Sequence, residues 1–174
     1  MREPVTGSVR EPVTGKEKDL HPELLKRWRQ AKAEYARRFP NLPEPFLTQT
    51  YRPPKRQAQL YAVGRGQPGK PYSVAGYDVI APTLNEYPRW AIITNARPGE
   101  SLHNYYPALA FDIAFRDGKD GYSCAECFSK FAGIAKFFGL EWGGDWVGFK
   151  DNPHFQPPGY TWQMAKSGVE PFKV

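Results

Sequence analysis

The sequence is poor in the residues from which several kinds of protein are built. It has only two cysteines among 174 residues, which excludes a scaffold held together by many disulfides. Two thiols without a neighbouring histidine also cannot complete a structural zinc site. No apolar run is long enough for a membrane span. Residues 1–19 lack the apolar core of a secretory signal, so we expect synthesis in the cytoplasm.

Proline, glycine and positive charge are plentiful instead. The 18 prolines and 16 glycines predict many turns between short regular elements. The formal net charge of +6 favours polyanionic partners such as nucleic acid, acidic lipid or an anionic cell wall, without choosing among them. The length suits one domain with one core. REPVTG occurs at 2–7 and again at 10–15, so we interpret residues 1–19 as a flexible tail and residues 20–174 as the domain.

Apolar spacing predicts the regular elements of the first half. Helical spacing runs from His21 to about Arg38, and a short strand is expected at 46–50. The next segment, YRPPKRQAQLYAVGR, reads as a turn and a helix with a basic, glutamine-rich face. Residues 64–100 are punctuated by glycine and proline; we expect one strand there, at 91–95, and a loop that acts as a lid or rim.

The second half predicts a strand, a helix and two short extended pieces. Alternation in ALAFDIAF, residues 108–115, places bulky side chains on the core face and Asp112 among alanines on the other. A helix that ends near Gly139 is expected to begin with a capping box of Ser123 and Glu126 and to carry Cys124 and Cys127 as buried thiols. The order of elements favours an α+β fold with a small, mostly antiparallel sheet and flanking helices.

Three polar residues near these strands form a set that suits a metal ion. His103, Asp112 and His154 offer two imidazoles and one carboxylate, which fill three positions of a tetrahedral zinc site and leave the fourth open. A nearby carboxylate that is not a ligand would serve as general base. Asp151 stands three residues before His154, but spacing does not separate it from Asp145 or Glu141.

Four segments together resemble the M15 peptidases. SLHNYYPALAFDIAF is similar to the first metal signature of that family, and EWGGDWVGFKDNPHFQ to the second. YRPPKRQAQLYAVGR and ARPGES resemble segments that precede them. The resemblance covers roughly residues 21–156 and points to the peptidoglycan L-alanyl-D-glutamate endopeptidases, many of them phage endolysins. It implies the fold that D-alanyl-D-alanine peptidases share with the Hedgehog signalling domains.

The resemblance also implies a role for each matching residue. One Zn²⁺ ion would be held by His103, Asp112 and His154, with Asp151 as the catalytic base. Arg52 matches an arginine that steadies the substrate carbonyl. Ser101 and Trp142 match positions expected to support the substrate or the ligands. One departure leaves the position of His103 open: the loop at 104–107 is two residues longer than usual and lacks the family's glycine.

Several functions stay open at this point. The expected activity is cleavage of a peptidoglycan stem peptide by a monomeric cell-wall lysin that reaches the wall through a holin-like partner, with anionic wall polymers attracting the positive charge. A D-alanyl-D-alanine carboxypeptidase is the alternative within the enzyme class. A binding module with a vestigial zinc site is the alternative of another class. A nucleic-acid binder would show salt-sensitive binding without metal dependence, and we expect no such partner.

Overall fold

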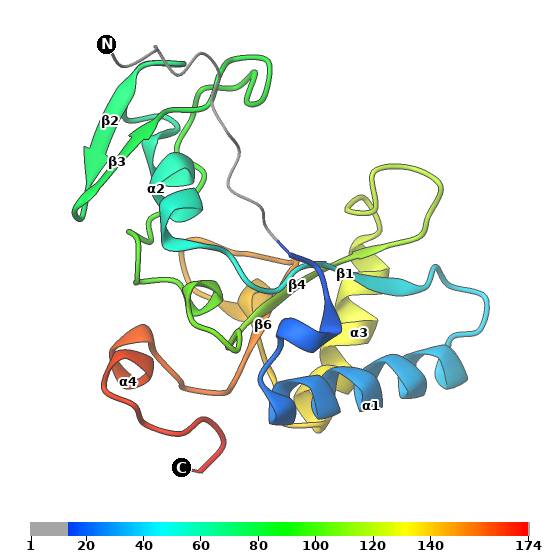
Figure 1. Cartoon of the computed structure of the whole chain (residues 1–174). Helices are drawn as coiled ribbons and strands as arrows, with labels where there is room; N and C mark the ends of the chain where they lie inside the picture. Colours follow the sequence, from blue (N-terminus) through cyan, green and yellow to red (C-terminus); the bar gives the residue numbers. More distant parts are fainter. Residues whose placement is uncertain (1–13, 174) are drawn as a thin grey trace.

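The computed structural model describes residues 14–173, whose helices and strands follow one another as labelled in Figure 1. In chain order they are η1 (Glu17–Asp19), α1 (Pro22–Arg38), β1 (Pro45–Gln49), α2 (Pro54–Ala62), β2 (Pro71–Val74), β3 (Tyr77–Ile80), η2 (Leu102–Asn104), β4 (Phe111–Phe115), α3 (Ala125–Phe137), β5 (Glu141–Trp142), η3 (Gly143–Asp145), β6 (His154–Gln156) and α4 (Trp162–Lys166), where η denotes a 3-10 helix. Among the described residues, no helix is long and apolar enough to cross a membrane.

A four-stranded sheet forms the centre of the fold. Its strand order is β1-β4-β6-β5, and every pair of neighbours is antiparallel. Helices α1 and α3 lie together beside this sheet in Figure 1. The predicted α+β class with a small antiparallel sheet and flanking helices is therefore confirmed.

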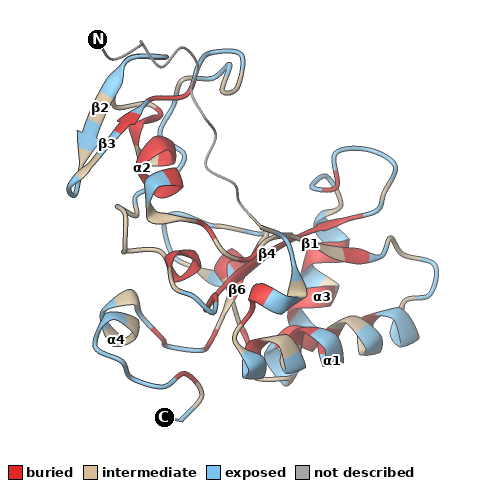
Figure 2. Ribbon diagram, viewed as in Figure 1, coloured by how far each residue is buried: buried red, intermediate tan, exposed pale blue. Residues whose placement is uncertain are grey.

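The main core lies between one face of the sheet and helices α1 and α3. Trp28 of α1 contacts Phe111 of β4 at a ring distance of 5.4 Å, and Phe111 stacks on Phe155 of β6 at 5.5 Å. Phe131 of α3 closes the cluster by packing edge-on against Phe155. Figure 2 shows these inner surfaces as buried, whereas the outer sides of both helices are exposed. Burial of this aromatic cluster fixes the sheet that carries the polar residues on its opposite face.

Strand β4 follows the predicted alternation. Phe111, Ile113 and Phe115 belong to the main core, and Asp112 points to the other face. The alternation fails before the strand begins, because Ala108 packs in the main core and Leu109 in a second cluster with Leu102, Ala110 and Tyr160. The expected face is thus confirmed for residues 111–115 only.

The long segment at 64–100 contains a hairpin that the sequence did not reveal. Strands β2 and β3 pair through Val74 and Tyr77, with Ala75 and Gly76 between them at φ values of 49° and 80°. Two positive φ values fit the tight hairpin turns that usually contain Asn-Gly or Asp-Gly, so Ala-Gly gave little signal.

The strand expected at 91–95 is wrong. Side chains, rather than a neighbouring strand, hold this part of the backbone: Arg65 donates to the Thr94 carbonyl at 3.0 Å and Gln57 to the Ala96 carbonyl at 2.8 Å. Ile92 is 50% exposed, so this apolar residue does not mark a buried strand.

The expectation of two buried thiols is also wrong, because Cys124 and Cys127 form a disulfide at the first turn of α3. Cys124 caps the helix, and its Sγ accepts a hydrogen bond from the Cys127 amide at 3.2 Å. Ser123, the expected cap, donates its hydroxyl to Asp120 instead. Three residues of helical spacing bring the two Cα atoms to 5.3 Å, within disulfide range.

The packed part of the chain begins before residue 20. Thr14 exchanges backbone hydrogen bonds with Thr50 and Tyr51, and Asp19 is buried. Residues 14–19 therefore belong to the domain rather than to the expected tail. The first REPVTG copy and most of the second lie outside the described residues.

Candidate metal centre and active-site cleft

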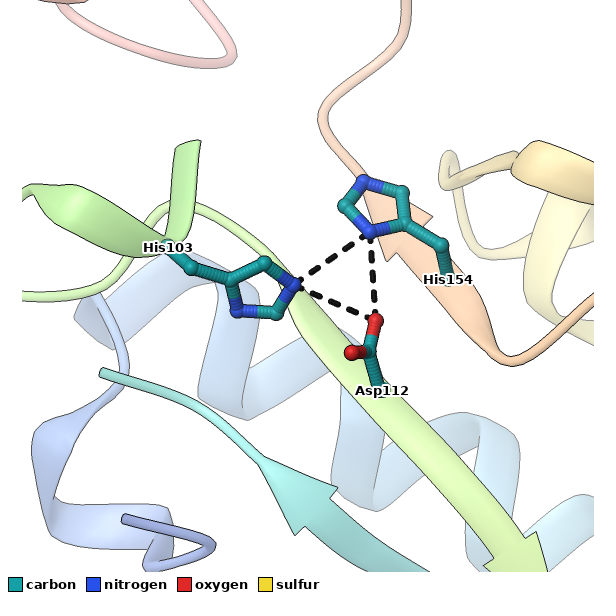
Figure 3. Close-up of side chains that lie close together, drawn as sticks. All are labelled: His103, Asp112 and His154. Carbon is teal, nitrogen blue, oxygen red and sulfur yellow. Dashed lines mark hydrogen bonds and ion pairs between the residues drawn. The ribbon is translucent and has the colours of Figure 1, made fainter. Parts of the chain in front are cut away.

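The three predicted ligands meet on the face of the sheet opposite α1 and α3. Asp112 of β4 and His154 of β6 are direct partners in the antiparallel register, so the ladder itself sets them side by side. His103 comes from η2 and faces both. Its Nε2 lies 3.2 Å from Asp112 Oδ1 and 3.3 Å from His154 Nδ1, and His154 Nδ1 lies 3.2 Å from Asp112 Oδ1. Figure 3 shows the three side chains pointing toward one point.

The longer loop at 104–107 does not displace His103. The His103 carbonyl accepts from the Arg52 amide at 2.9 Å, and Asn104 Nδ2 donates to the Arg52 carbonyl at 2.9 Å. Ser101 caps η2 by accepting from the His103 amide. These contacts tie η2 to the chain that follows β1, and a cis Tyr106–Pro107 bond lies in the loop that follows.

The donor set fits a metal ion. His103 Nδ1 donates to the Thr50 carbonyl at 2.7 Å, and His154 Nε2 donates to Gln156 Oε1 at 3.0 Å. With those nitrogens protonated, the inner nitrogens carry lone pairs that face each other and the carboxylate. Such a triangle is repulsive unless a cation lies between its members. All three residues are buried, and two imidazole nitrogens with one carboxylate oxygen suit zinc.

Burial and mutual charge shift the pKa values of these groups. Burial alone raises the pKa of Asp112, but the two imidazoles outweigh it and hold the pKa well below its ordinary value. Burial lowers the pKa of His103, which favours the neutral form that a metal requires. For His154, burial acts in the same direction, but Asp112 outweighs it and raises the pKa.

Asp151 lies in the same cleft as the three ligands. Burial, followed by repulsion from Asp112, raises the pKa of its carboxyl group. Among the described residues, none donates a hydrogen bond to this carboxylate, which leaves both oxygens available. The other two candidates for the base are engaged elsewhere. Asp145 is paired with Lys136 at 2.7 Å, and Glu141 accepts hydrogen bonds from Trp146 and Gly159.

A glycine that sequence reasoning missed allows this close arrangement. A Cβ atom added at Gly143 would lie 2.5 Å from the Asp151 carbonyl oxygen and 3.2 Å from the Cβ atoms of Asp151 and His154. The Asp151 amide also donates to the Gly143 carbonyl at 3.0 Å. Gly143 therefore lets the turn that carries Asp151 and His154 pack directly on η3. The only sequence signal was the Gly143-Gly144 pair after a short strand.

Arg52 is buried beside the ligands. Its Nη2 lies 3.7 Å from Asp112 Oδ2, and its Nη1 donates to Gln57 Oε1 at 2.8 Å. Gln49 accepts from the other side of the guanidinium. Burial lowers the pKa of Arg52, whereas Asp112 and Asp151 oppose this shift, and the group stays a cation. Of the basic, glutamine-rich face predicted for α2, Arg56, Gln57 and Gln59 are buried.

The cleft has a volume of about 480 Å³ and an open side. Arg52, Asp151 and the three candidate ligands form its polar floor. Its walls come from 94–96, 100–102, Trp146, Phe149, Gln156 and 160–163. The end of the 64–100 segment therefore lines the cleft, and its action as a lid or rim stays a prediction. Ser101 lines the cleft, whereas Trp142 lies outside it and donates its indole N–H to the Asn152 carbonyl at 2.7 Å. A contact of Trp142 with substrate stays a prediction.

Comparison with known proteins agrees with this arrangement. A profile of the M15 peptidases, described as D-alanyl-D-alanine carboxypeptidase, matches residues 94–157, which carry the three candidate ligands and Asp151. The chain is 32% identical over 146 residues to the peptidoglycan L-alanyl-D-glutamate endopeptidase CwlK of Bacillus subtilis, covering 79% of this chain and 73% of that protein.

Two further relatives match over a shorter stretch or at lower identity. The L-alanyl-D-glutamate peptidase of Listeria phage A118 is 34% identical over 82 residues, which are 45% of this chain and 29% of that protein. The L-Ala D-Glu endopeptidase ChiX of Serratia marcescens has a similar structure, with a TM-score of 0.48 and 14% identity over 88% of this chain and 87% of that one. The extent of the match to the Bacillus protein decides the family: the chain belongs to the M15 family of metallopeptidases.

Proposed function

We propose that the protein is a zinc-dependent endopeptidase that cleaves the bond between L-alanine and D-glutamate in peptidoglycan stem peptides. The observation that carries the proposal is the buried triangle of His103, Asp112 and His154 with the free carboxylate of Asp151 in the same cleft. The similarity to the Bacillus endopeptidase over most of both chains supports the choice of bond. The net charge of +6 suits a substrate embedded in anionic wall polymers.

The residues of the cleft supply the steps of an ordinary peptide hydrolysis. A zinc ion bound by the three ligands supplies Lewis-acid chemistry, because it polarises the scissile carbonyl and makes a water molecule more acidic. Asp151 takes a proton from the attacking water while the oxygen of that water forms a bond to the carbonyl carbon. The same carboxyl group then gives the proton to the leaving amine as the carbon–nitrogen bond breaks.

Arg52 stabilises the negative charge that develops on the carbonyl oxygen. Its guanidinium is preorganised, because Gln57 and Gln49 hold it from two sides. A buried cation fixed beforehand at this point stabilises the transition state more than a solvated one would. The raised pKa of Asp151 suits a group that must both accept and return a proton.

The carboxypeptidase description of the family profile favours a second candidate, the removal of D-alanine. The test is digestion of purified peptidoglycan with and without a zinc chelator, followed by mass spectrometry of the new termini. A new amino-terminal D-glutamate that disappears with the chelator is the expected result. Free D-alanine would support the carboxypeptidase. Absence of cleavage in the zinc-loaded protein would contradict enzymatic function and favour a binding module.

Access to the wall is a separate part of the proposal. We propose that the protein is made in the cytoplasm and acts as a monomer on the wall after release through a holin-like partner. The similarity to a phage peptidase supports this route. Its test is lysis of a host culture in which the protein is expressed alone or together with a holin.

A further inference from the structure

Gln156 has a hydrogen-bonding environment that fixes which way its amide points. Its Nε2 donates to the Tyr160 carbonyl at 3.1 Å and to Glu141 Oε1 at 3.4 Å. A carbonyl and a carboxylate only accept, so the NH₂ group must face them. The amide oxygen of Gln156 is therefore turned toward His154 Nε2, which lies 3.0 Å away.

This orientation determines the tautomer of His154. A fixed acceptor opposite Nε2 requires a proton on that nitrogen. The Nδ1 atom is then left with its lone pair, directed toward Asp112 Oδ1 and His103 Nε2 at 3.2 and 3.3 Å. His103 reaches the equivalent state through the Thr50 carbonyl, which is part of the backbone. His154 depends on a side chain for the same effect.

Glu141 holds that side chain in place. It is opposite Gln156 in the β5–β6 register, so the two side chains lie beside each other. Its Oε1 also accepts from the Trp146 indole at 2.7 Å, and its Oε2 accepts from the Gly159 amide at 2.8 Å. Trp146 belongs to one wall of the cleft, and Gly159 precedes the wall at 160–163. The Glu141 carboxylate thus connects Gln156, the hydrogen-bond partner of His154, with two walls of the cleft.

We propose that Gln156 is the positioning residue for His154, and that Glu141 anchors it. Gln156 sets the tautomer and ring orientation with which His154 binds the metal ion, and Glu141 sets the orientation of Gln156. Hydrogen-bond partners behind a ligating histidine change metal affinity by about 10- to 100-fold when they are removed. The proposal rests on the proposed zinc binding at His103, Asp112 and His154.

The experiment compares the zinc affinity of the full chain with that of Gln156→Leu, by competition with a chelator of known affinity. We expect about 10- to 100-fold weaker binding in the variant. Gln163→Leu is the matched control, because Gln163 lines the same cleft but is exposed, and its zinc affinity should stay unchanged. Melting of the metal-free proteins distinguishes a positioning role of Gln156 from a merely structural one. If the role is merely structural, Gln156→Leu would lower the melting temperature and leave zinc affinity unchanged, which would overturn the proposal.

A second variant keeps the test decisive if Gln156→Leu does not fold. Glu141→Gln keeps the shape of the anchor but replaces one acceptor oxygen by a donor, so we expect several-fold weaker zinc binding. Long-range proton–nitrogen NMR of the metal-free wild type, at a pH at which His154 is neutral, should show its single ring proton on Nε2. A proton on Nδ1, or unchanged zinc affinity in both folded variants, would refute the positioning role. A wild type that binds no zinc would instead refute the proposed function.

Discussion

Gly143→Ala is a single-methyl change that should loosen the site without removing any reactive group. The new Cβ would be 2.5 Å from the Asp151 carbonyl oxygen, a separation that real Cβ atoms do not show. The Asp151 carbonyl oxygen belongs to the backbone, so the clash cannot be relieved by rotating a long side chain. The φ of Gly143 is not in the left-handed region, and the cost of the methyl group is therefore steric.

The structure gives the size of the effect. The 151–154 turn must move away from η3 by about 0.5–1 Å, and overpacking of this kind costs about 1–3 kcal/mol of stability. The same movement shifts Asp151 and His154 together, because the His154 amide donates to the Asp151 carbonyl at 3.2 Å. A displacement of about 1 Å in a catalytic group lowers the rate by about 100-fold.

Urea unfolding of the metal-free protein measures the first effect, and peptidoglycan hydrolysis by the zinc-loaded protein measures the second. Gly133→Ala is the matched control, because it adds the same methyl group where nothing lies within 4 Å. That position is exposed on α3, where alanine is expected to stabilise the helix by up to about 1 kcal/mol. A Gly143→Ala protein with normal stability and normal turnover would show that the packing argument is wrong.

Three other substitutions test separate parts of the structure. Asp151→Asn should bind zinc as the wild type does and lose turnover, whereas loss of zinc from this variant would indicate that Asp151 is a ligand. Arg52→Ala should retain zinc and lose about 100- to 1000-fold in turnover, as expected when a preorganised donor is removed, and near-normal hydrolysis would contradict its role. Tyr35→Phe should raise the free energy of unfolding by about 1 kcal/mol, because the buried Tyr35 hydroxyl has no partner among the described residues. Burial, with a smaller effect of Glu126, raises the pKa of Tyr35 to about 12, so the wild type should lose stability between pH 10 and 12. Urea titrations should show a smaller loss in the variant, in which burial still raises the pKa values of Tyr105 and Tyr160.

The sequence predicted the elements whose signal is local. Helix α1 and strand β4 follow from the 3.6-residue and two-residue apolar periods, and both bury the faces that those periods indicate. The hairpin at 71–80 was missed, because its turn uses Ala-Gly rather than the common turn residues. The strand expected at 91–95 fails, because an apolar run needs a partner strand, and side chains of Gln57 and Arg65 satisfy this backbone instead.

The site also contains some residues that the sequence predicted and others whose role depends on contacts made only in the folded chain. The three-ligand set and its resemblance to the M15 signatures predicted which side chains meet, and the antiparallel register explains why Asp112 and His154 do so. The support behind them could not be predicted, because Gln156, Glu141 and Gly143 act through neighbours that only the folded chain brings together. A lone glutamine or glycine in a sequence carries no mark of such a role.

The arrangement also explains how a longer loop at 104–107 leaves the metal centre intact. Two contacts that orient His103 cross to the chain after β1: the ring bonds to the Thr50 carbonyl, and the His103 carbonyl bonds to the Arg52 amide. Asp112 and His154 take their positions from two paired strands. The loop therefore has only to connect Asn104 to the segment before β4, and its length is free to vary. Because Arg52 belongs to the segment that holds His103, the proposed oxyanion group and the metal centre are placed by the same few backbone hydrogen bonds.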